Sequence, residues 1–114
     1  MTPAMRLIRP AAAVLVAMLA TAAFAQDVPL FKLVARDGKF EPATLEVPAG
    51  QRVRIEVSNQ NAKAIEFESK DLKQEKVIAP GKSAVFTLNA LKPGEYKYFD
   101  EFQQSTGQGR IVAK

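Results

Sequence analysis

The chain has 114 residues, with 16 basic and 12 acidic side chains, a net charge of +4, and neither histidine nor cysteine. This length supports one domain with a single core, and the absence of cysteine excludes a disulfide framework and a thiol nucleophile. Without a histidine base or a cysteine nucleophile, we do not expect a hydrolytic enzyme.

The N-terminal residues have the pattern of a secretory signal peptide. Arg6 and Arg9 precede an apolar stretch at residues 11–23, and small residues lead up to Ala25, before the polar Gln26. The apolar stretch is shorter than the ~20 residues that a membrane-spanning helix needs. We therefore expect export and cleavage after Ala25 rather than retention as a membrane anchor.

Cleavage would leave residues 26–114 as one exported domain, after a signal peptide at residues 1–25. Two of the 16 basic residues leave with the signal while all 12 acidic residues stay, so the net charge falls from +4 to +2. Charges of both signs at alternate positions of residues 52–56 are typical of a solvated strand face. We expect a mature form that neither spans the membrane nor binds nucleic acid.

Short alternating segments predict an all-β fold. Apolar and polar residues alternate at residues 31–33, 52–57 and 84–88, as in half-buried strands. Turn residues rich in glycine and proline separate these segments at a spacing typical of a β-sandwich. We expect at most one short helical turn, at residues 69–76, with Ser69 as its cap.

Residues 91–96 have the form of a tyrosine corner, with Leu91, Pro93 and Gly94 preceding Tyr96. In such a corner the tyrosine hydroxyl bonds to the backbone just upstream, at a Greek-key crossover. This feature indicates the fold and carries no chemistry.

Several motifs together resemble the cupredoxin family across nearly the whole mature chain. They are Phe40-x-Pro42-x-x-Leu45-x-Val47-Pro48-Ala49-Gly50, Val53-x-Ile55-x-Val57-x-Asn59, Pro80-Gly81, Leu91-x-Pro93-Gly94-x-Tyr96-x-Tyr98 and Gly109-x-Ile111-Val112. The resemblance implies a Greek-key β-sandwich of the cupredoxin type.

Residues 66–78 and 99–102 are similar to a narrower branch of that family. This branch comprises small periplasmic cupredoxin-like proteins, and the related domain of larger ones, that accompany iron-permease ferrous-iron uptake systems in bacteria. The resemblance implies iron and/or copper as the bound metal, and an inner-membrane iron permease and periplasmic uptake components as partners. Such proteins are proposed to oxidise ferrous iron with copper as redox partner, so ferroxidase-type activity is left open.

The same resemblance places the family's copper ligands on residues that cannot form a type 1 site. The first histidine position falls at about Ile65, the cysteine at Asp100, the second histidine at Gln103 and the methionine near Gly107. A blue-copper site depends on a soft thiolate. We therefore expect no type 1 blue-copper site.

Four carboxylates are the candidate metal ligands: Glu66, Glu68, Asp100 and Glu101. Strand periodicity turns Asp100 inward, where a carboxylate needs either the loop amides of residues 103–106 or a metal as its partner. It turns Glu66 and Glu68 outward, where they could meet Glu101 and repel one another unless a cation intervenes. Carboxylate oxygens suit manganese, calcium, magnesium and ferric iron, and hold ferrous iron and cupric copper less selectively. Among these ions, iron is the one that the resemblance implies.

Two other interpretations remain open from the sequence. The domain could be a metal-free β-sandwich interaction module that presents Phe99 and Phe102 to a protein partner. The outward acids could also be an ordinary strand surface of lysines and glutamates. We interpret Asp71 and Glu75 as ordinary surface charge beside lysines and leave them out of the predicted ligand set.

Overall fold

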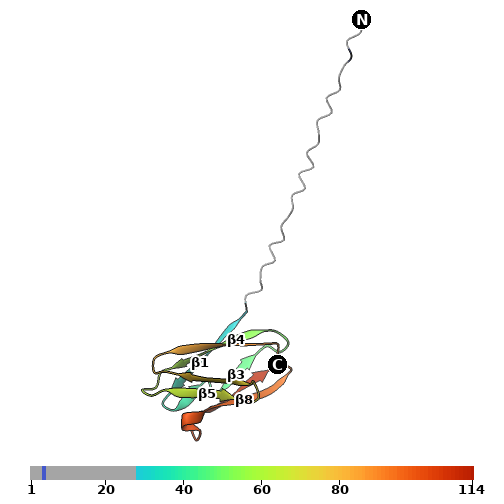
Figure 1. Ribbon diagram of the computed structural model, residues 1–114. Helices are drawn as coiled ribbons and strands as arrows, with labels where there is room; N and C mark the ends of the chain where they lie inside the picture. The colour runs from blue at the N-terminus through green and yellow to red at the C-terminus, as the bar shows by residue number, and fades with distance from the viewer. Residues whose placement is uncertain (1–3, 5–27) are drawn as a thin grey trace.

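The computed structural model describes Ala4 and residues 28–114, and this part of the chain contains nine strands, most of which alternate buried and exposed side chains. The strands form two packed sheets (Figure 1). The predicted signal peptide lies, apart from Ala4, outside the described residues. Within the described part of the chain, no helix has the length and apolar character needed to cross a membrane.

The first sheet has the strand order β2-β1-β4-β7, in which β1 and β4 run parallel and the other neighbours antiparallel. Its strands are β1 (Leu30–Arg36), β2 (Lys39–Glu41), β4 (Val53–Asn59) and β7 (Ser83–Leu88). The predicted strands at residues 31–33, 52–57 and 84–88 are confirmed, because each falls on one of these elements with alternating burial.

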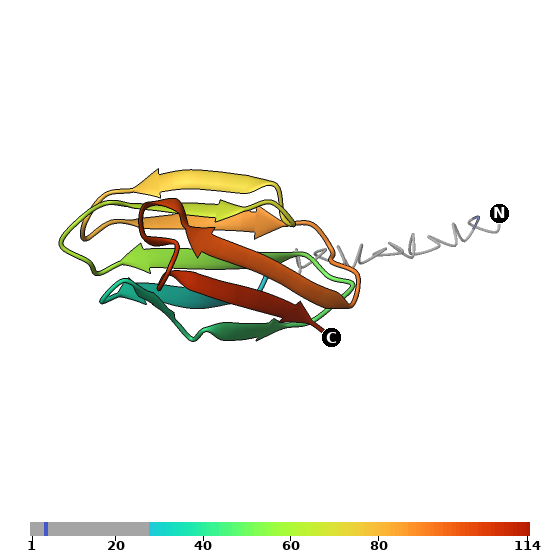
Figure 2. The same ribbon diagram turned by 90° about the horizontal axis from the view of Figure 1, so that it is seen from below.

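The second sheet has the order β3-β9-β8-β5-β6, and its only parallel pair among the described strands is β3 with β9. Its strands are β3 (Thr44–Val47), β5 (Ile65–Ser69), β6 (Gln74–Ile78), β8 (Gly94–Asp100) and β9 (Gln108–Ala113). A single 3-10 turn, η1 (Glu101–Gln103), follows β8. Figure 2 shows the loop that contains it, between β8 and β9.

Inward-facing side chains of both sheets form one hydrophobic core, with an aromatic group at its centre. The Phe67 ring lies 6.0 Å from Phe40, 4.8 Å from Phe86 and 5.1 Å from Tyr98, measured between centroids. Ring pairs at these separations add stability beyond their buried area. Because Phe67 anchors β5 inward, its neighbours Glu66 and Glu68 must point outward.

The predicted tyrosine corner is confirmed. The Tyr96 hydroxyl donates a hydrogen bond of 2.8 Å to the carbonyl oxygen of Lys92. This bond fixes the connection from β7, in the first sheet, to β8, in the second.

The predicted helical turn at residues 69–76 is wrong, because this segment forms the hairpin between β5 and β6. The buried Ser69 hydroxyl donates to the Lys97 carbonyl at 2.6 Å and accepts from the Leu72 amide at 3.1 Å. Lys73 adopts a left-handed φ of 55°, which reverses the chain. Ser69 therefore caps a β-turn, and the one short helical turn of the described residues is η1.

Candidate functional site

Asp100 ends β8 on the inward face and is only 3% exposed. Its Oδ1 atom accepts hydrogen bonds from the backbone amides of Glu66 and Phe102, both at 3.0 Å. The first amide belongs to β5 and the second to η1, so Asp100 ties these two elements together. Amide donors of this kind stabilise a buried carboxylate. The predicted donors, the amides of residues 103–106, are therefore wrong, although the prediction of backbone amides as partners is correct.

The loop after β8 packs closely on Asp100. The Asp100 amide donates to the Gly107 carbonyl at 2.7 Å, and the Gly107 amide donates to the Gln103 carbonyl at 2.8 Å. A β-carbon added at Gly107 would lie 2.8 Å from the Asp100 β-carbon, so the position requires glycine. Among the described residues, every buried side-chain nitrogen or oxygen has a hydrogen-bond partner.

A second acidic group lies on the outer face of the β5–β6 hairpin. Glu66 and Glu68 project from β5, and Glu75 in β6 lies directly opposite Glu68 in the strand register. One carboxylate oxygen from each of the three lies within 4.8 Å of the other two. A cation that binds oxygens at about 2.3–2.6 Å spans ligand separations of this size. The three acids are therefore placed to bind one ion together.

The Glu66 carboxyl lies beside that of its neighbour Glu75. The hydrogen bond between their side chains is the main cause that raises the pKa of Glu66 from 4.5 to about 7. Desolvation and repulsion by Glu75, Glu101 and Glu68 raise this pKa further. Two carboxyl groups approach this closely only when a proton or a cation lies between them. Glu66 therefore keeps its proton to a higher pH than an ordinary glutamate does.

Glu68 forms a similar pair with Glu101, which starts η1. A hydrogen bond between their side chains is the main cause that raises the pKa of Glu68, followed by desolvation and by repulsion from Glu101 and Glu75. The Lys70 ammonium partly opposes this rise. We call Glu66, Glu68, Glu75 and Glu101 the outer carboxylate cluster.

The structure brings together three of the four predicted ligands, Glu66, Glu68 and Glu101. Asp100 instead faces inward, as the strand periodicity predicted, and contacts the backbone of β5 rather than the carboxylates on its outer face. The role of all four residues as metal ligands stays a prediction.

Glu75 is the cluster member that the sequence interpretation missed. A helical reading of residues 69–76 grouped it with Asp71, whereas the hairpin sets it against Glu68. Asp71 has a different role, since its Oδ2 atom accepts a hydrogen bond of 2.8 Å from the Lys97 backbone amide. Recognising a turn at residues 70–73 would have identified Glu75, because the register of a hairpin fixes which side chains face each other.

Residues 10–113 match the family described as the cupredoxin-like domain. The chain belongs to this family. A relative, an uncharacterised protein of Rickettsia prowazekii (strain Madrid E) named RP394, is 41% identical over 81 residues, which cover 71% of this chain. The match spans 65% of that relative's length, which is less than two thirds.

Solved copper proteins share the fold of this cupredoxin-like domain. Auracyanin A, a blue copper protein from Chloroflexus aurantiacus, superposes with a TM-score of 0.64 and 16% identity, covering 75% of this chain and 99% of that one. The metal binding domain of the Cu(I)-exporting ATPase CopA of Streptococcus pneumoniae D39 gives a TM-score of 0.63 and 13% identity, covering 76% and 94%. Both comparisons confirm the predicted cupredoxin-type β-sandwich.

The residues at the predicted copper position do not fit a type 1 centre. The chain contains no cysteine. Ile65 is a buried apolar side chain, Asp100 Oδ1 is held by two backbone amides, and Gly107 has no side chain. The outer carboxylate cluster offers only oxygen donors, which fit a harder cation than the one a thiolate selects.

Proposed function

We propose that this cupredoxin-like protein is a periplasmic accessory protein of iron uptake that binds iron and/or copper through the outer carboxylate cluster. The observation that carries the proposal is the convergence of Glu66, Glu68 and Glu75 within 4.8 Å. A divalent or trivalent cation replaces the shared protons and removes the repulsion between the carboxylates.

The elements that hold the cluster suit this role. Glu66 and Glu68 extend from β5, whose alternate residues Ile65 and Phe67 are fixed in the core. In this proposal Asp100 is a positioning residue, because it holds the backbone of β5 and η1 at a constant separation. Side chains anchored in this way need little rearrangement to receive an ion.

We include in the proposal that the cluster assists the oxidation of ferrous iron by an external electron acceptor. Carboxylate oxygens favour the ferric over the ferrous ion, so they make loss of an electron from bound iron more favourable. The electron must go to an external acceptor such as cupric copper or dioxygen, because residues 26–114 contain no cysteine, histidine or methionine. The chain itself contributes ligands and takes up or releases protons at Glu66 and Glu68.

Delivery to an inner-membrane iron permease and contact with periplasmic uptake components rest on the resemblance of residues 66–78 and 99–102 to permease-associated proteins. These two stretches contain every member of the outer carboxylate cluster. A cluster on the outer face of a sheet can pass its ion to a partner without opening the core. The proposal therefore assigns recognition and metal binding to the same surface.

Thermal unfolding with and without metal tests the proposal. A ligand that binds only the native state stabilises it by about 2.7 kcal/mol at 100 times its dissociation constant. We expect Fe²⁺ under argon, Cu²⁺ or Mn²⁺ to raise the midpoint of the wild type. The double variant Glu66→Gln/Glu75→Gln should lose most of this rise.

The matched control is Glu56→Gln, because Glu56 is half-buried like Glu66 but projects from β4 in the other sheet. It should keep the full rise in midpoint. Absence of any rise with all three metals, or equal loss in the control, would show that the cluster is not a metal site.

A second function is favoured by one observation. Phe102, next to Glu101 in η1, is 53% exposed. An exposed aromatic beside charged residues suits a contact with a protein partner. If the protein is a metal-free interaction module, metals should not change its thermal unfolding midpoint. Phe102→Ser should then abolish binding of the protein partner while leaving that midpoint unchanged.

A further inference from the structure

A groove crosses the outer face of the second sheet, beside the outer carboxylate cluster. Its volume is about 550 Å³, which lies within the ~300–1,000 Å³ usual for small-ligand sites. Residues of β3, β8 and β9, the β5–β6 turn and the loop after η1 line it. Its lining includes Lys70, Lys97, Phe99, Gln104, Gln108 and Arg110.

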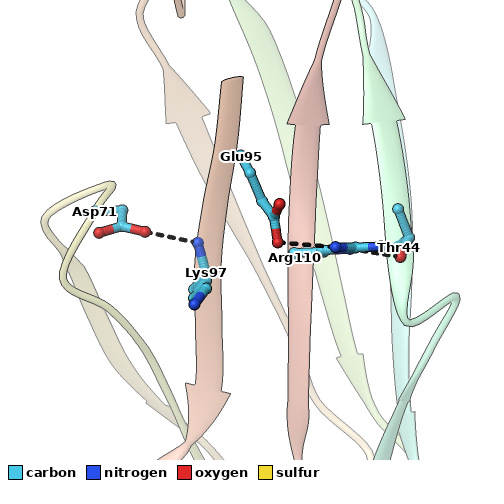
Figure 3. A network of polar contacts seen from close by, with 5 residues as sticks. All are labelled: Thr44, Asp71, Glu95, Lys97 and Arg110. Carbon is cyan, nitrogen blue, oxygen red and sulfur yellow. Dashed lines mark hydrogen bonds and ion pairs between the residues drawn. The ribbon is translucent and has the colours of Figure 1, made fainter. Parts of the chain in front are cut away.

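The groove is positively charged. Lys70, Lys97 and Arg110 line it together with a single acid, Glu95, which leaves a net charge of +2. Neither lysine takes part in the ion pairs found among the described residues. The Lys97 amide is bound by Asp71, which fixes the backbone that carries this side chain (Figure 3).

Arg110 is held in place across the sheet. Its Nη1 atom donates to Glu95 Oε1 at 3.0 Å and its Nε atom donates to Thr44 Oγ1 at 3.1 Å, so the side chain bridges β8 and β3 across β9 (Figure 3). A guanidinium has five N–H donors, and these two contacts leave others for an anion. A side chain that is already ordered loses less entropy when a ligand binds.

We propose that this groove binds a small organic polycarboxylate, either free or as a metal chelate. One carboxylate leaves the net charge of +2 unbalanced, whereas two balance it and three equal the number of basic side chains in the groove. The side-chain amide of Gln104 adds a neutral donor at the end near η1, where Gln108 Nε2 already donates one hydrogen bond to the Gln104 carbonyl at 2.8 Å and has a second hydrogen to offer. The half-buried Phe99 gives the carbon skeleton an apolar surface.

The groove adjoins the outer carboxylate cluster, because Phe99 pairs with Glu68 across β8 and β5. A bound chelate would therefore have its carboxylates on the basic side and its metal toward the acidic side. Only this chelate form rests on the proposed function. Binding of the free polycarboxylate stands without it.

Titration of the protein, expressed from the full sequence, with citrate tests the proposal through backbone-amide NMR shifts. We expect saturable shifts at groove residues, and at least tenfold weaker binding of acetate at equal ionic strength. Lys97→Gln and Arg110→Gln should each weaken citrate binding by about two- to fivefold, as expected for an exposed charge pair. The control Lys82→Gln removes the same charge from the exposed turn before β7 and should change nothing.

Three results would overturn the proposal: no saturable shifts, equal weakening by Lys82→Gln and Lys97→Gln, or inorganic phosphate binding as tightly as citrate. Amide spectra of each variant show whether it is folded, and Lys70→Gln replaces any variant that is not.

Ferric citrate distinguishes the two sources of the ligand. If ferric citrate binds the wild type more tightly than free citrate does, and this difference is lost in Glu66→Gln/Glu75→Gln, the ligand is the chelate. If both bind the wild type equally tightly, the ligand is the free acid. If the wild type binds metal but not citrate, the proposal for the groove is refuted and the proposed function is not. Loss of metal binding with citrate binding retained refutes the proposed function alone.

Discussion

Asp100 and Glu66 are neighbouring acids in very different surroundings. The buried Asp100 carboxylate accepts hydrogen bonds from two backbone amides, one of which is the amide of Glu66 itself. The Glu66 side chain points the opposite way, and the groups that raise its pKa are other carboxyls. The acid at the predicted copper position therefore stabilises the fold, whereas the acids available for chemistry lie on the outer face.

The largest expected effect is the loss of stability in Asp100→Ala. Two amides near the core lose their acceptor, so the free energy of unfolding should fall by about 3 kcal/mol in urea denaturation. Asp100→Asn keeps an acceptor oxygen and should lose less. If Asp100 positions rather than binds, folded Asp100→Asn should also keep its metal affinity. A loss below about 1 kcal/mol in the alanine variant would contradict the structural role.

The next largest effect is on metal affinity in Glu75→Gln. Removing one of three converging carboxylates should weaken binding at least about tenfold, measured by titration calorimetry. Asp71→Asn is the matched control, because Asp71 lies on the same hairpin but binds the Lys97 amide. Equal loss in both variants would mean that the general charge of the hairpin, and not the cluster, attracts the metal.

The smallest effect is the pH dependence of the metal-free protein. The pKa of Glu66 is about 7 in the folded state, against 4.5 for the ordinary group. The folded state therefore binds more protons than the unfolded state between these values, and the stability from this group is lost as the pH rises through about 7. The midpoint should fall between pH 5 and pH 8, and Glu66→Gln should flatten that fall. An identical profile in wild type and variant would contradict the shared proton.

Much of the fold could be predicted because its signals are local. The alternation in β4 and β7 and the corner at Tyr96 each lie within a few residues of sequence. The helical reading of residues 69–76 failed because a serine cap followed by charged residues fits a β-turn equally well. The pairing of β5 with β6 across that turn decides between the two.

The parts of the candidate site that depend on local periodicity could also be predicted, and the parts that depend on strand register could not. Strand periodicity correctly separated the outward Glu66 and Glu68 from the inward Asp100. It could not identify Glu75 as a partner, or the amides that reach Asp100, because both depend on the strand register. The basic groove was not predictable either, since Lys70 and Arg110 are brought together only by the order of the strands in the sheet.

The most direct test of the central claim is the number of protons released when metal binds. Titration calorimetry near pH 6.5, in buffers of different ionisation enthalpy, measures this number. If the outer carboxylate cluster holds shared protons that a cation replaces, about one proton should leave per bound ion, and fewer in Glu66→Gln. Metal binding without proton release, or with the same release in Glu66→Gln, would contradict the account.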